Sequence, residues 1–306
     1  FFSYPEPPDY VRAQRDLDLL KAAGESVRFG NTRITEYRPK FIKEQDTQFA
    51  GVTFLLDDGS LFVTFRGTDN TLVGWKEDLS MSFRSVIPSQ ALAKQYLQDV
   101  LMTHSGPVRV SGHSKGGNLA VYAAMNAEDG VKDRIERIYS LDGPGFPEAV
   151  VNSFEYASVS DRIVKIVPDS SVVGMVLETP ERCMVVKSDV EGIMQHFAFS
   201  WQMHGGEFDK VEDVANSSVT FNKALNKWLA NLSKEQRERA VDALFAVLEA
   251  SGAGSISAMM AAGPKVIPEM LGTYVGLSIE DRRNLNQALG IMLQAALARN
   301  PKVRRR

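Results

Sequence analysis

Cysteine is almost absent from this chain of 306 residues, in which Cys183 stands alone. One cysteine cannot form an internal disulfide, and zinc sites built on several cysteines are excluded. The fold therefore does not depend on an oxidising compartment, and we expect a cytoplasmic protein. No apolar run reaches the roughly 18 residues that a membrane-spanning helix needs, so we expect no transmembrane segment. Residues 1–20 contain three prolines and alternating charges instead of the apolar stretch of a signal peptide.

A surplus of basic residues is also lacking. The 35 Lys and Arg residues stand against 38 Asp and Glu, which gives a net charge of −3. Nucleic-acid-binding proteins usually carry a basic excess, so we expect no nucleic-acid partner. The one basic cluster, Lys302 to Arg306, is interpreted as a solvated tail. Hydrophobic residues make up 44% of the chain, the share of an ordinary folded protein, so a disordered or fibrous chain is excluded.

Strand and helix patterns alternate over the first two thirds of the chain. Residues 51–56 and 61–65 predict a hairpin, because Asp58-Gly59 supplies the positive φ that a tight turn requires. The other predicted strands are 108–111, 135–141, 163–167 and 184–187, and the predicted helices are 9–24, 90–103 and 115–127. This alternation favours an α/β fold with a mostly parallel sheet flanked by helices.

The pattern changes after about residue 220, where four helical patterns and no strand pattern follow. Ser233-Lys-Glu-Gln236 is a capping box before an apolar-periodic run, and Ser278-Ile-Glu-Asp281 is a similar start for the last helix. We therefore divide the chain into an α/β core of residues 1–219 and an all-helical extension of residues 220–306. The extension is a candidate lid over a site or a candidate homodimer surface.

A nucleophile elbow is the sharpest chemical signal. Residues 112–116 read G-x-S-x-G, directly after a predicted strand and directly before a predicted helix. A sharp strand-to-helix turn exposes the hydroxyl of Ser114, and side chains at the two glycines would collide with the neighbouring strand or helix. The backbone N–H of Lys115 then lies at a helix N-terminus, aimed where an oxyanion would form. We predict Ser114 as the nucleophile and the Lys115 N–H as an oxyanion donor.

A serine nucleophile needs a base, and the base needs an orienting carboxylate. In hydrolases of this layout the chain order is Ser, then acid, then His. Of the four histidines, His104 precedes Ser114 and His113 lies inside the elbow, which leaves His196 and His204. We prefer His196, because it follows a strand and a polar loop and begins a run of aromatic residues. His204 is the alternative.

The residues alone leave the orienting acid open. Asp142, Asp161 and Asp169 are the candidates, and both Asp142 and Asp169 lie at the carboxyl end of a predicted strand, where catalytic groups gather in parallel sheets. Asp142 is followed at once by Gly143-Pro144-Gly145, and an aspartate before such a turn is often a turn former. Asp169 follows its strand through Pro168.

A further segment, Phe65-Arg-Gly-Thr68 with Trp75 and Asp78-Leu79 downstream, also lies at a strand end. A glycine followed by a hydroxyl residue there could supply both an N–H and an O–H to an oxyanion. Together with Gly112-His-Ser-Lys-Gly-Gly117, this segment resembles the class 3 lipases. More closely, the chain resembles a little-characterised bacterial branch of lipase-like α/β-hydrolases that carries GHSKGGNLA. The resemblance covers about residues 45–205.

The resemblance implies an α/β-hydrolase fold and a role for each matching position. Ser114 matches the nucleophile and His196 the base, while Thr68 joins the Lys115 N–H in the oxyanion hole. The class 3 pattern places its acid in a loop with Asp and Pro after an apolar strand, which implies Asp169. The segment that begins with Asp142, Asp-Gly-Pro-Gly, instead matches a structural turn of the family. Asp142 is therefore kept as the alternative and not as the first choice.

Class 3 lipases usually have leucine where Lys115 stands. We consider three interpretations of this lysine: it attracts an acidic substrate, it pairs with a nearby carboxylate, or it faces solvent on the first turn of its helix.

The sequence thus predicts a serine esterase or lipase that hydrolyses carboxylic esters through a Ser-His-Asp triad and an acyl-enzyme. The alternative is an acyltransferase or thioesterase that uses the same triad, and a third hypothesis is a non-catalytic interaction module. We expect a small-molecule ester substrate with an apolar acyl or alcohol portion. This chemistry needs no cofactor, and no cluster of metal ligands is evident in the sequence.

Overall fold

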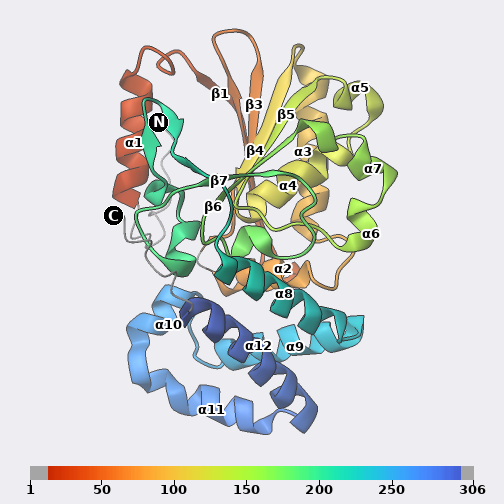
Figure 1. Ribbon diagram of the computed structural model, residues 1–306, viewed down its shortest axis with the longest axis vertical. Coiled ribbons are helices and arrows are strands. Elements are labelled where there is room, and N and C mark those ends of the chain that lie inside the picture. The colour runs from red at the N-terminus through yellow and green to blue at the C-terminus, as the bar shows by residue number, and fades with distance from the viewer. Residues whose placement is uncertain (1–12, 70, 298–306) are drawn as a thin grey trace.

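An eight-stranded sheet forms the centre of the molecule, in the order β1-β2-β3-β4-β5-β6-β7-β10 (Figure 1). The structure is a computed structural model that describes residues 13–69 and 71–297. The interpretation of Lys302 to Arg306 as a solvated tail lies outside the described residues. The sheet strands are β1 (Arg33–Ile42), β2 (Thr47–Leu55), β3 (Leu61–Phe65), β4 (Val108–His113), β5 (Ile135–Leu141), β6 (Ile163–Pro168), β7 (Cys183–Val186) and β10 (Lys210–Val211). A separate hairpin consists of β8 (Met203–His204) and β9 (Glu207–Phe208).

Parallel pairing joins β3 to β4, β4 to β5, β5 to β6 and β6 to β7, whereas β1, β2 and β10 pair in the antiparallel sense. The predicted mostly parallel sheet is therefore confirmed. Because parallel strands end at the same edge, the residues that follow β3, β4, β5 and β6 meet there. Each of these strands is followed in the chain by one of the predicted site residues, so all four lie at this carboxyl edge: Thr68, Ser114, Asp142 and Asp169.

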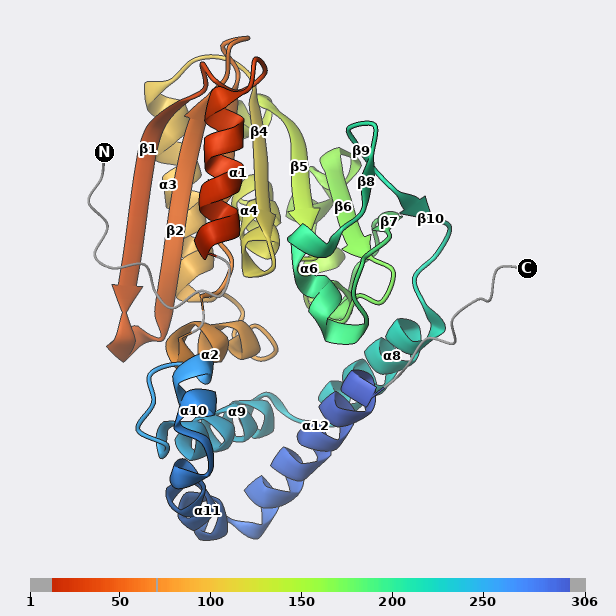
Figure 2. The same ribbon diagram turned by 90° about the vertical axis from the view of Figure 1, so that its left-hand side faces the viewer.

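Helices α3 and α4 pack on one face of the sheet, and α1 lies on the side of the other face with most of its side chains exposed (Figure 2). The helices of this part are α1 (Ala13–Glu25), α2 (Leu72–Ser80), α3 (Pro88–Thr103), α4 (Lys115–Met125), α5 (Asp129–Lys132), α6 (Glu148–Val151) and α7 (Phe154–Ala157). The main core lies between the sheet and α3 and α4, where Leu61, Val110, Leu97 and Leu119 have no exposed surface. Each such side chain contributes about 1.5–3 kcal/mol through burial, which fixes the strands that carry the site.

The C-terminal part is helical as predicted, and it lies against the carboxyl edge of the sheet (Figures 1 and 2). Its helices are α8 (Asn216–Ala230), α9 (Lys234–Glu249), α10 (Ile256–Ala262), α11 (Ile267–Gly276) and α12 (Ile279–Leu297). Val241 and Phe245 of α9 pack against Leu72 on α2 and against Phe83, which follows that helix. Helix α12 packs against the 3-10 turn Gly192–His196, and α8 packs against the turn Val173–Met175. The proposed division at residues 219 and 220 falls within α8.

The strand β1 is not apparent from the sequence. Its segment, RITEYRPKFI, carries four charged residues and a proline, and most of it is half-buried or exposed. Edge strands commonly carry charge and proline because one side has no strand to pair with, so the alternating apolar pattern is missing.

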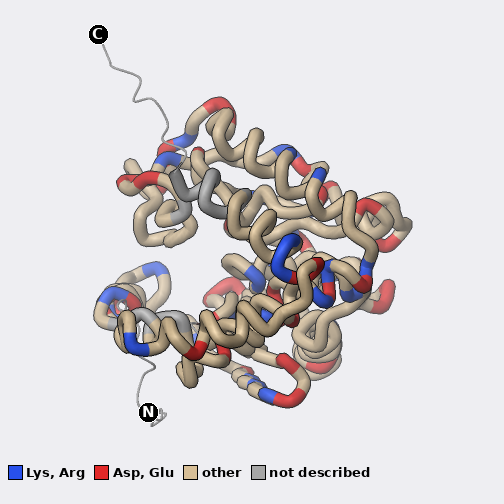
Figure 3. The backbone as a smooth tube through the Cα atoms, turned by 90° about the horizontal axis from the view of Figure 1, so that it is seen from below, with Lys and Arg blue, Asp and Glu red and all other residues tan. Residues whose placement is uncertain are grey.

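The view in Figure 3 shows basic and acidic residues interspersed along the chain, with long uncharged stretches between them.

None of the helices in the described part of the chain is both long enough and apolar enough to cross a membrane.

Candidate active site

The turn from β4 into α4 holds Ser114 in an unusual backbone conformation. Its φ of 58° and ψ of −132° are rare for a residue with a side chain, and such strain is concentrated at functional sites. A Cβ added to Gly112 would lie 2.1 Å from the Gly116 carbonyl, and one added to Gly116 would lie 2.1 Å from Phe65 O. Both glycines are therefore required sterically, as the sequence predicts for a nucleophile elbow.

His196 is hydrogen-bonded to Asp142 across the carboxyl edge. Its Nδ1 lies 2.6 Å from Asp142 Oδ2, and the Asp142 side chain has no exposed surface. Because an ionised carboxylate only accepts hydrogen bonds, Nδ1 carries the proton in the neutral imidazole, and Nε2 is left as the basic nitrogen. This is the tautomer that a general base requires.

Asp142 itself is held by two donors from the loop after β6. Its Oδ1 accepts hydrogen bonds from Ser171 Oγ at 2.5 Å and from Gly174 N at 3.1 Å. A Cβ added to Gly174 would lie 2.3 Å from Oδ1, so a side chain there would displace the carboxylate. The φ of Asp142 is 47°, a left-handed conformation that aspartate adopts more readily than most residues.

The structure brings His196 to Asp142 and not to Asp169, the acid that the resemblance implies. Asp169 does follow β6 at the carboxyl edge, but its backbone bridges other segments, donating to Val186 O and accepting from Ala215 N. The carboxylate bonded to His196 is that of Asp142, the alternative. The physical reason is that both strand ends reach the same edge, and the left-handed turn at Asp142 selects which carboxylate meets the imidazole.

His196 lies beside the elbow because of the residue that precedes the serine. The rings of His113 and His196 have centroids 4.6 Å apart, and His113 Nε2 lies 2.7 Å from His196 O. A carbonyl only accepts, so His113 Nε2 is the donor in this bond. Ser114 N donates in turn to Leu141 O, the residue before Asp142, at 2.9 Å. Ser114, His196 and Asp142 are thus brought together by direct contacts between their segments.

The other titratable candidates lie elsewhere. His204 is exposed in the β8–β9 hairpin. Asp161 lies at the amino end of β6, with its side chain 83% exposed beside Arg162. In the part of the chain that the structure describes, no group of three or more His, Cys, Asp or Glu side chains is placed to hold a metal ion.

Thr68 lies against the elbow, but its hydroxyl is already used. A Cβ added to the preceding Gly67 would lie 3.1 Å from Ser114 Cβ, so the two loops are in contact. Thr68 Oγ1 donates to Asp78 Oδ2, and a hydroxyl has only one proton to donate. The expectation that the threonine supplies both its N–H and its O–H is therefore corrected, because this arrangement leaves only the backbone N–H for an oxyanion.

The side chain of Lys115 is fully buried and does not face solvent. Its Nζ donates to Glu77 Oε2 at 2.7 Å, to Gln48 O at 2.8 Å and to Gln48 Oε1 at 3.0 Å, and Asp78 Oδ1 lies 3.6 Å away. Of the three interpretations, pairing with a carboxylate is the one observed. Burial raises the pKa of Asp78 to about 6, although the Lys115 ammonium and the Thr68 hydroxyl act in the opposite direction.

Sequence reasoning missed Glu77, Ser171 and Gly174. Glu77 has no exposed surface and accepts from the backbone N–H groups of Gln48 at 3.1 Å and Ser89 at 2.9 Å, besides Lys115. A lysine directly after the nucleophile, in a position where leucine is usual, was the signal for such a partner. Ser171 and Gly174 gave no comparable signal, because only the folded loop brings them to Asp142.

A second buried lysine, Lys165 on β6, lies near the site and forms no ion pair with a carboxylate among the described residues. It is 3% exposed, and its Nζ donates to Thr179 Oγ1 at 3.1 Å. Its neighbours in the sheet register are Ser140 and Cys183. Burial lowers the pKa of Lys165 from 10.5 to about 8, and nearby Cys183 and Asp142 act in the opposite direction.

We expect this lysine to make stability depend on alkaline pH. Between the folded pKa of about 8 and the ordinary value of 10.5, the unfolded chain binds more protons, so stability rises with pH. Urea unfolding at about pH 7 and about pH 9.5 should show wild type gaining about 2 kcal/mol relative to Lys165→Met. The exposed Lys210→Met serves as the control and should show no such change. A gap between wild type and Lys165→Met that stays constant with pH would contradict the assignment.

Comparisons with known proteins find one family model and several solved structures that match part of this chain. A family model described as Mbeg1-like matches residues 23–246. Among solved structures, the M37 lipase is 18% identical with a TM-score of 0.40, over 55% of this chain and 64% of the lipase chain. The Rhizomucor miehei lipase in its propeptide complex is 17% identical with a TM-score of 0.40, over 57% of this chain and 64% of that chain.

The match thus spans 64% of the length of both lipase chains. A comparison with curated proteins gives no match.

Proposed function

The chain belongs to the Mbeg1-like family, and from this premise we propose that it is a serine hydrolase that cleaves carboxylic esters through Ser114, His196 and Asp142. The observation that carries the proposal is the 2.6 Å bond from His196 Nδ1 to the buried Asp142, next to a serine at φ 58° on a strand-to-helix turn. A non-catalytic module would have no need to keep a strained serine, an oriented imidazole and a buried carboxylate at one edge of the sheet.

The proposed reaction has two halves. Ser114 Oγ attacks the ester carbonyl carbon while His196 Nε2 takes the hydroxyl proton, and Asp142 stabilises the imidazolium that forms. The tetrahedral intermediate collapses when the C–O bond breaks and the leaving alkoxide takes the proton from His196. Water then attacks the acyl-enzyme, His196 takes a proton from it and returns one to Ser114, and the carboxylic acid leaves.

The oxyanion of both intermediates would be held by the backbone N–H groups of Thr68 and Lys115. Lys115 is the first residue of α4, and the N–H groups of the first helical turn have no acceptor within the helix. Thr68 is kept beside the elbow by its bond to Asp78. Donors of this kind each contribute about 3–4 kcal/mol to transition-state stabilisation.

Labelling with a fluorophosphonate probe tests the proposal. We expect intact-mass analysis of the wild type to show one adduct, mapped to Ser114, and no adduct on Ser114→Ala. The probe reacts only with a serine that a base activates. Folding of both proteins is checked by circular dichroism. A folded wild type that stays unlabelled would contradict the hydrolase proposal.

Acyl transfer uses the same residues and differs in what attacks the acyl-enzyme. Turnover of an activated ester is therefore measured with and without an added alcohol or thiol. If the acceptor raises turnover and the transfer ester or thioester accumulates, the proposed function narrows to an acyltransferase. If only the carboxylic acid forms, hydrolysis stands.

A further inference from the structure

The segment that follows Asp142 is held by a side chain from the helix of the nucleophile. Asn118 lies on α4, four residues after Ser114, and is 1% exposed. Its Nδ2 donates to Gly145 O at 2.9 Å and to Pro144 O at 3.3 Å. Both of these residues are buried, and both follow Asp142 within three positions. A side chain of α4 is thus bonded directly to the turn that carries the acid.

A second amide fixes the orientation of Asn118. Gln90 on α3 is 5% exposed, and its Oε1 accepts a hydrogen bond from Ile87 N at 3.0 Å. With its oxygen used in this way, Gln90 donates from Nε2 to Asn118 Oδ1 at 2.8 Å. Because carbonyls only accept, both hydrogens of Asn118 Nδ2 are directed at the segment after Asp142. One buried chain of amides therefore joins α3, α4 and this segment.

Two glycines let the segment lie directly against α4. A Cβ added to Gly143 would lie 2.9 Å from Ser114 O and 3.0 Å from Asn118 N. A Cβ added to Gly117 would lie 3.1 Å from Gly143 Cα. The motif residues Gly117 and Asn118, which the triad itself does not use, thus form the contact between the helix of the nucleophile and the strand end that carries the acid.

The turn at Asp142 needs such an anchor from outside. Its φ of 47° is left-handed, and a strained conformation persists only when the surrounding structure fixes it. The next residues are Gly143-Pro144-Gly145, in which glycine is conformationally permissive and proline has no N–H to stabilise a turn. On the side of β6, Asp142 N donates to Ile166 O at 2.7 Å. Asn118 supplies the corresponding bonds on the side of α4.

We propose that Asn118 is a positioning residue of the triad. It fixes the turn at Asp142 relative to α4, which begins directly after Ser114, so that the carboxylate bonded to His196 keeps its place relative to the nucleophile. Asn118 acts through Asp142 and is not itself a catalytic residue. The inference rests on the proposed function, because a positioning role requires a triad that reacts.

Burst kinetics with an activated ester separate the rate of acylation from the binding of the ester. Leucine has the branched shape of asparagine without its donors. We expect Asn118→Leu to acylate about 100-fold more slowly, because a displacement of about 1 Å at a catalytic group has an effect of this size. The affinity for the ester should change less than about threefold, because Asn118 does not bind it. Asn118→Ala adds no bulk, should show the same split, and gives the result if the leucine variant does not fold.

A double variant tests whether Asn118 acts through Asp142. In the background of Asp142→Asn, we expect Asn118→Leu to slow fluorophosphonate labelling by less than about threefold more, because the carboxylate that it positions is already lost. A merely structural contribution, independent of Asp142, would instead multiply the two losses.

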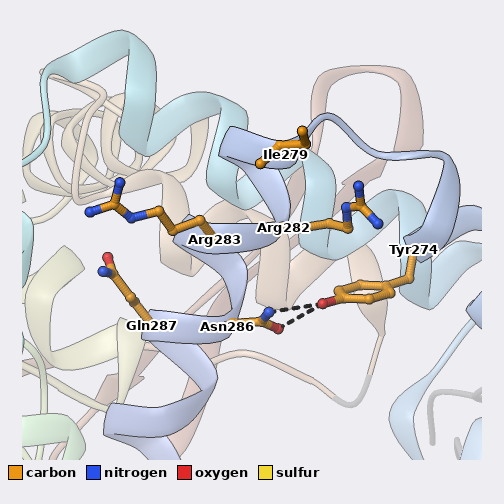
Figure 4. A pocket seen from close by; sticks show the side chains of 6 residues that line it. All are labelled: Tyr274, Ile279, Arg282, Arg283, Asn286 and Gln287. Carbon is orange, nitrogen blue, oxygen red and sulfur yellow. Dashed lines mark hydrogen bonds between the residues drawn. The ribbon is translucent and has the colours of Figure 1, made fainter.

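Two other asparagines serve as controls. Asn126, also on α4, donates from Nδ2 to Tyr122 O within the same helix at 2.9 Å. Asn286 lies in a hollow lined by residues of α11 and α12, where it donates to Tyr274 Oη at 2.8 Å and accepts from it at 3.0 Å (Figure 4). Asn126→Leu and Asn286→Leu remove amide bonds that do not reach the segment after Asp142. Each should change the acylation rate less than about threefold.

The proton on His196 Nδ1 gives a measurement that needs no turnover. Its hydrogen bond to a carboxylate moves its NMR resonance downfield, and Asp142→Asn identifies the resonance by removing that carboxylate. We expect Asn118→Leu to shift or broaden the resonance, whereas the two control variants should leave it unchanged.

Two results would overturn the inference. In the first, the acylation rate and the Nδ1 resonance of Asn118→Leu match those of the control variants. In the second, the losses multiply in the double variant. A wild type that fluorophosphonate leaves unlabelled, but whose Nδ1 resonance still depends on Asn118, would contradict the proposed function and support the positioning of Asp142.

Discussion

Asp142→Asn is expected to lower the rate of acylation about 10⁴-fold, whereas Asp169→Asn changes it less than about tenfold. The asparagine amide offers hydrogens to Nδ1 of His196, which favours the tautomer with the proton on Nε2. That nitrogen then cannot take the proton of Ser114. Burst kinetics with an activated ester measure acylation directly, and the pair of variants separates the two carboxylates that the sequence left as alternatives.

The variant Asp169→Asn is the control for this prediction. Its contacts to Val186 and Ala215 run through its backbone, so its amide variant should keep them. Thermal unfolding verifies that both variants are folded at the assay temperature. A large loss in Asp169→Asn together with a small one in Asp142→Asn would contradict the pairing of His196 with Asp142.

The α/β part of the fold is predictable because its local signals agree with each other. Asp58-Gly59 separates two apolar runs, and Gly59 adopts the φ of 78° that the turn requires. The strand Ile135–Leu141 was predicted with its observed bounds, since β-branched and aromatic residues alternate there with polar ones. β1 shows no such pattern, because an edge strand packs less and tolerates charge.

The site is predictable only where chemistry and chain order coincide. Ser114 follows from the elbow, and His196 follows from the order of the triad, and the structure brings their segments together. The choice of acid depends on a backbone angle at Asp142 and on donors from Ser171 and Gly174, which no local pattern encodes. In the same way, the local sequence does not show that the side chain of Lys115 is buried. The elements that bury it, α2 and β2, are distant from it in the chain.

Lys115→Met is expected to destabilise the protein by about 3–5 kcal/mol, because it leaves the buried Glu77 without its cation. Glu77 keeps its two backbone donors, but its charge is then uncompensated, and Asp78 loses the ammonium that opposes the rise of its pKa. Urea unfolding at neutral pH measures the loss. We expect the acylation rate of the folded variant to fall as well, since Asp78 holds Thr68 and Lys115 begins α4.

The double variant Lys115→Met/Glu77→Gln decides whether the effect comes from the unpaired charge. It should be at least about 2 kcal/mol more stable than the sum of the two single variants predicts, because neither buried charge remains. The exposed pair Arg239 and Glu280, at the similar distance of 2.8 Å, is the matched control. Arg239→Met and Glu280→Gln should each cost less than about 1 kcal/mol and show little coupling, because water screens this pair. Equal coupling in the two pairs would mean that Lys115 stabilises the elbow by packing alone, and its role beside the oxyanion donors would have to be abandoned.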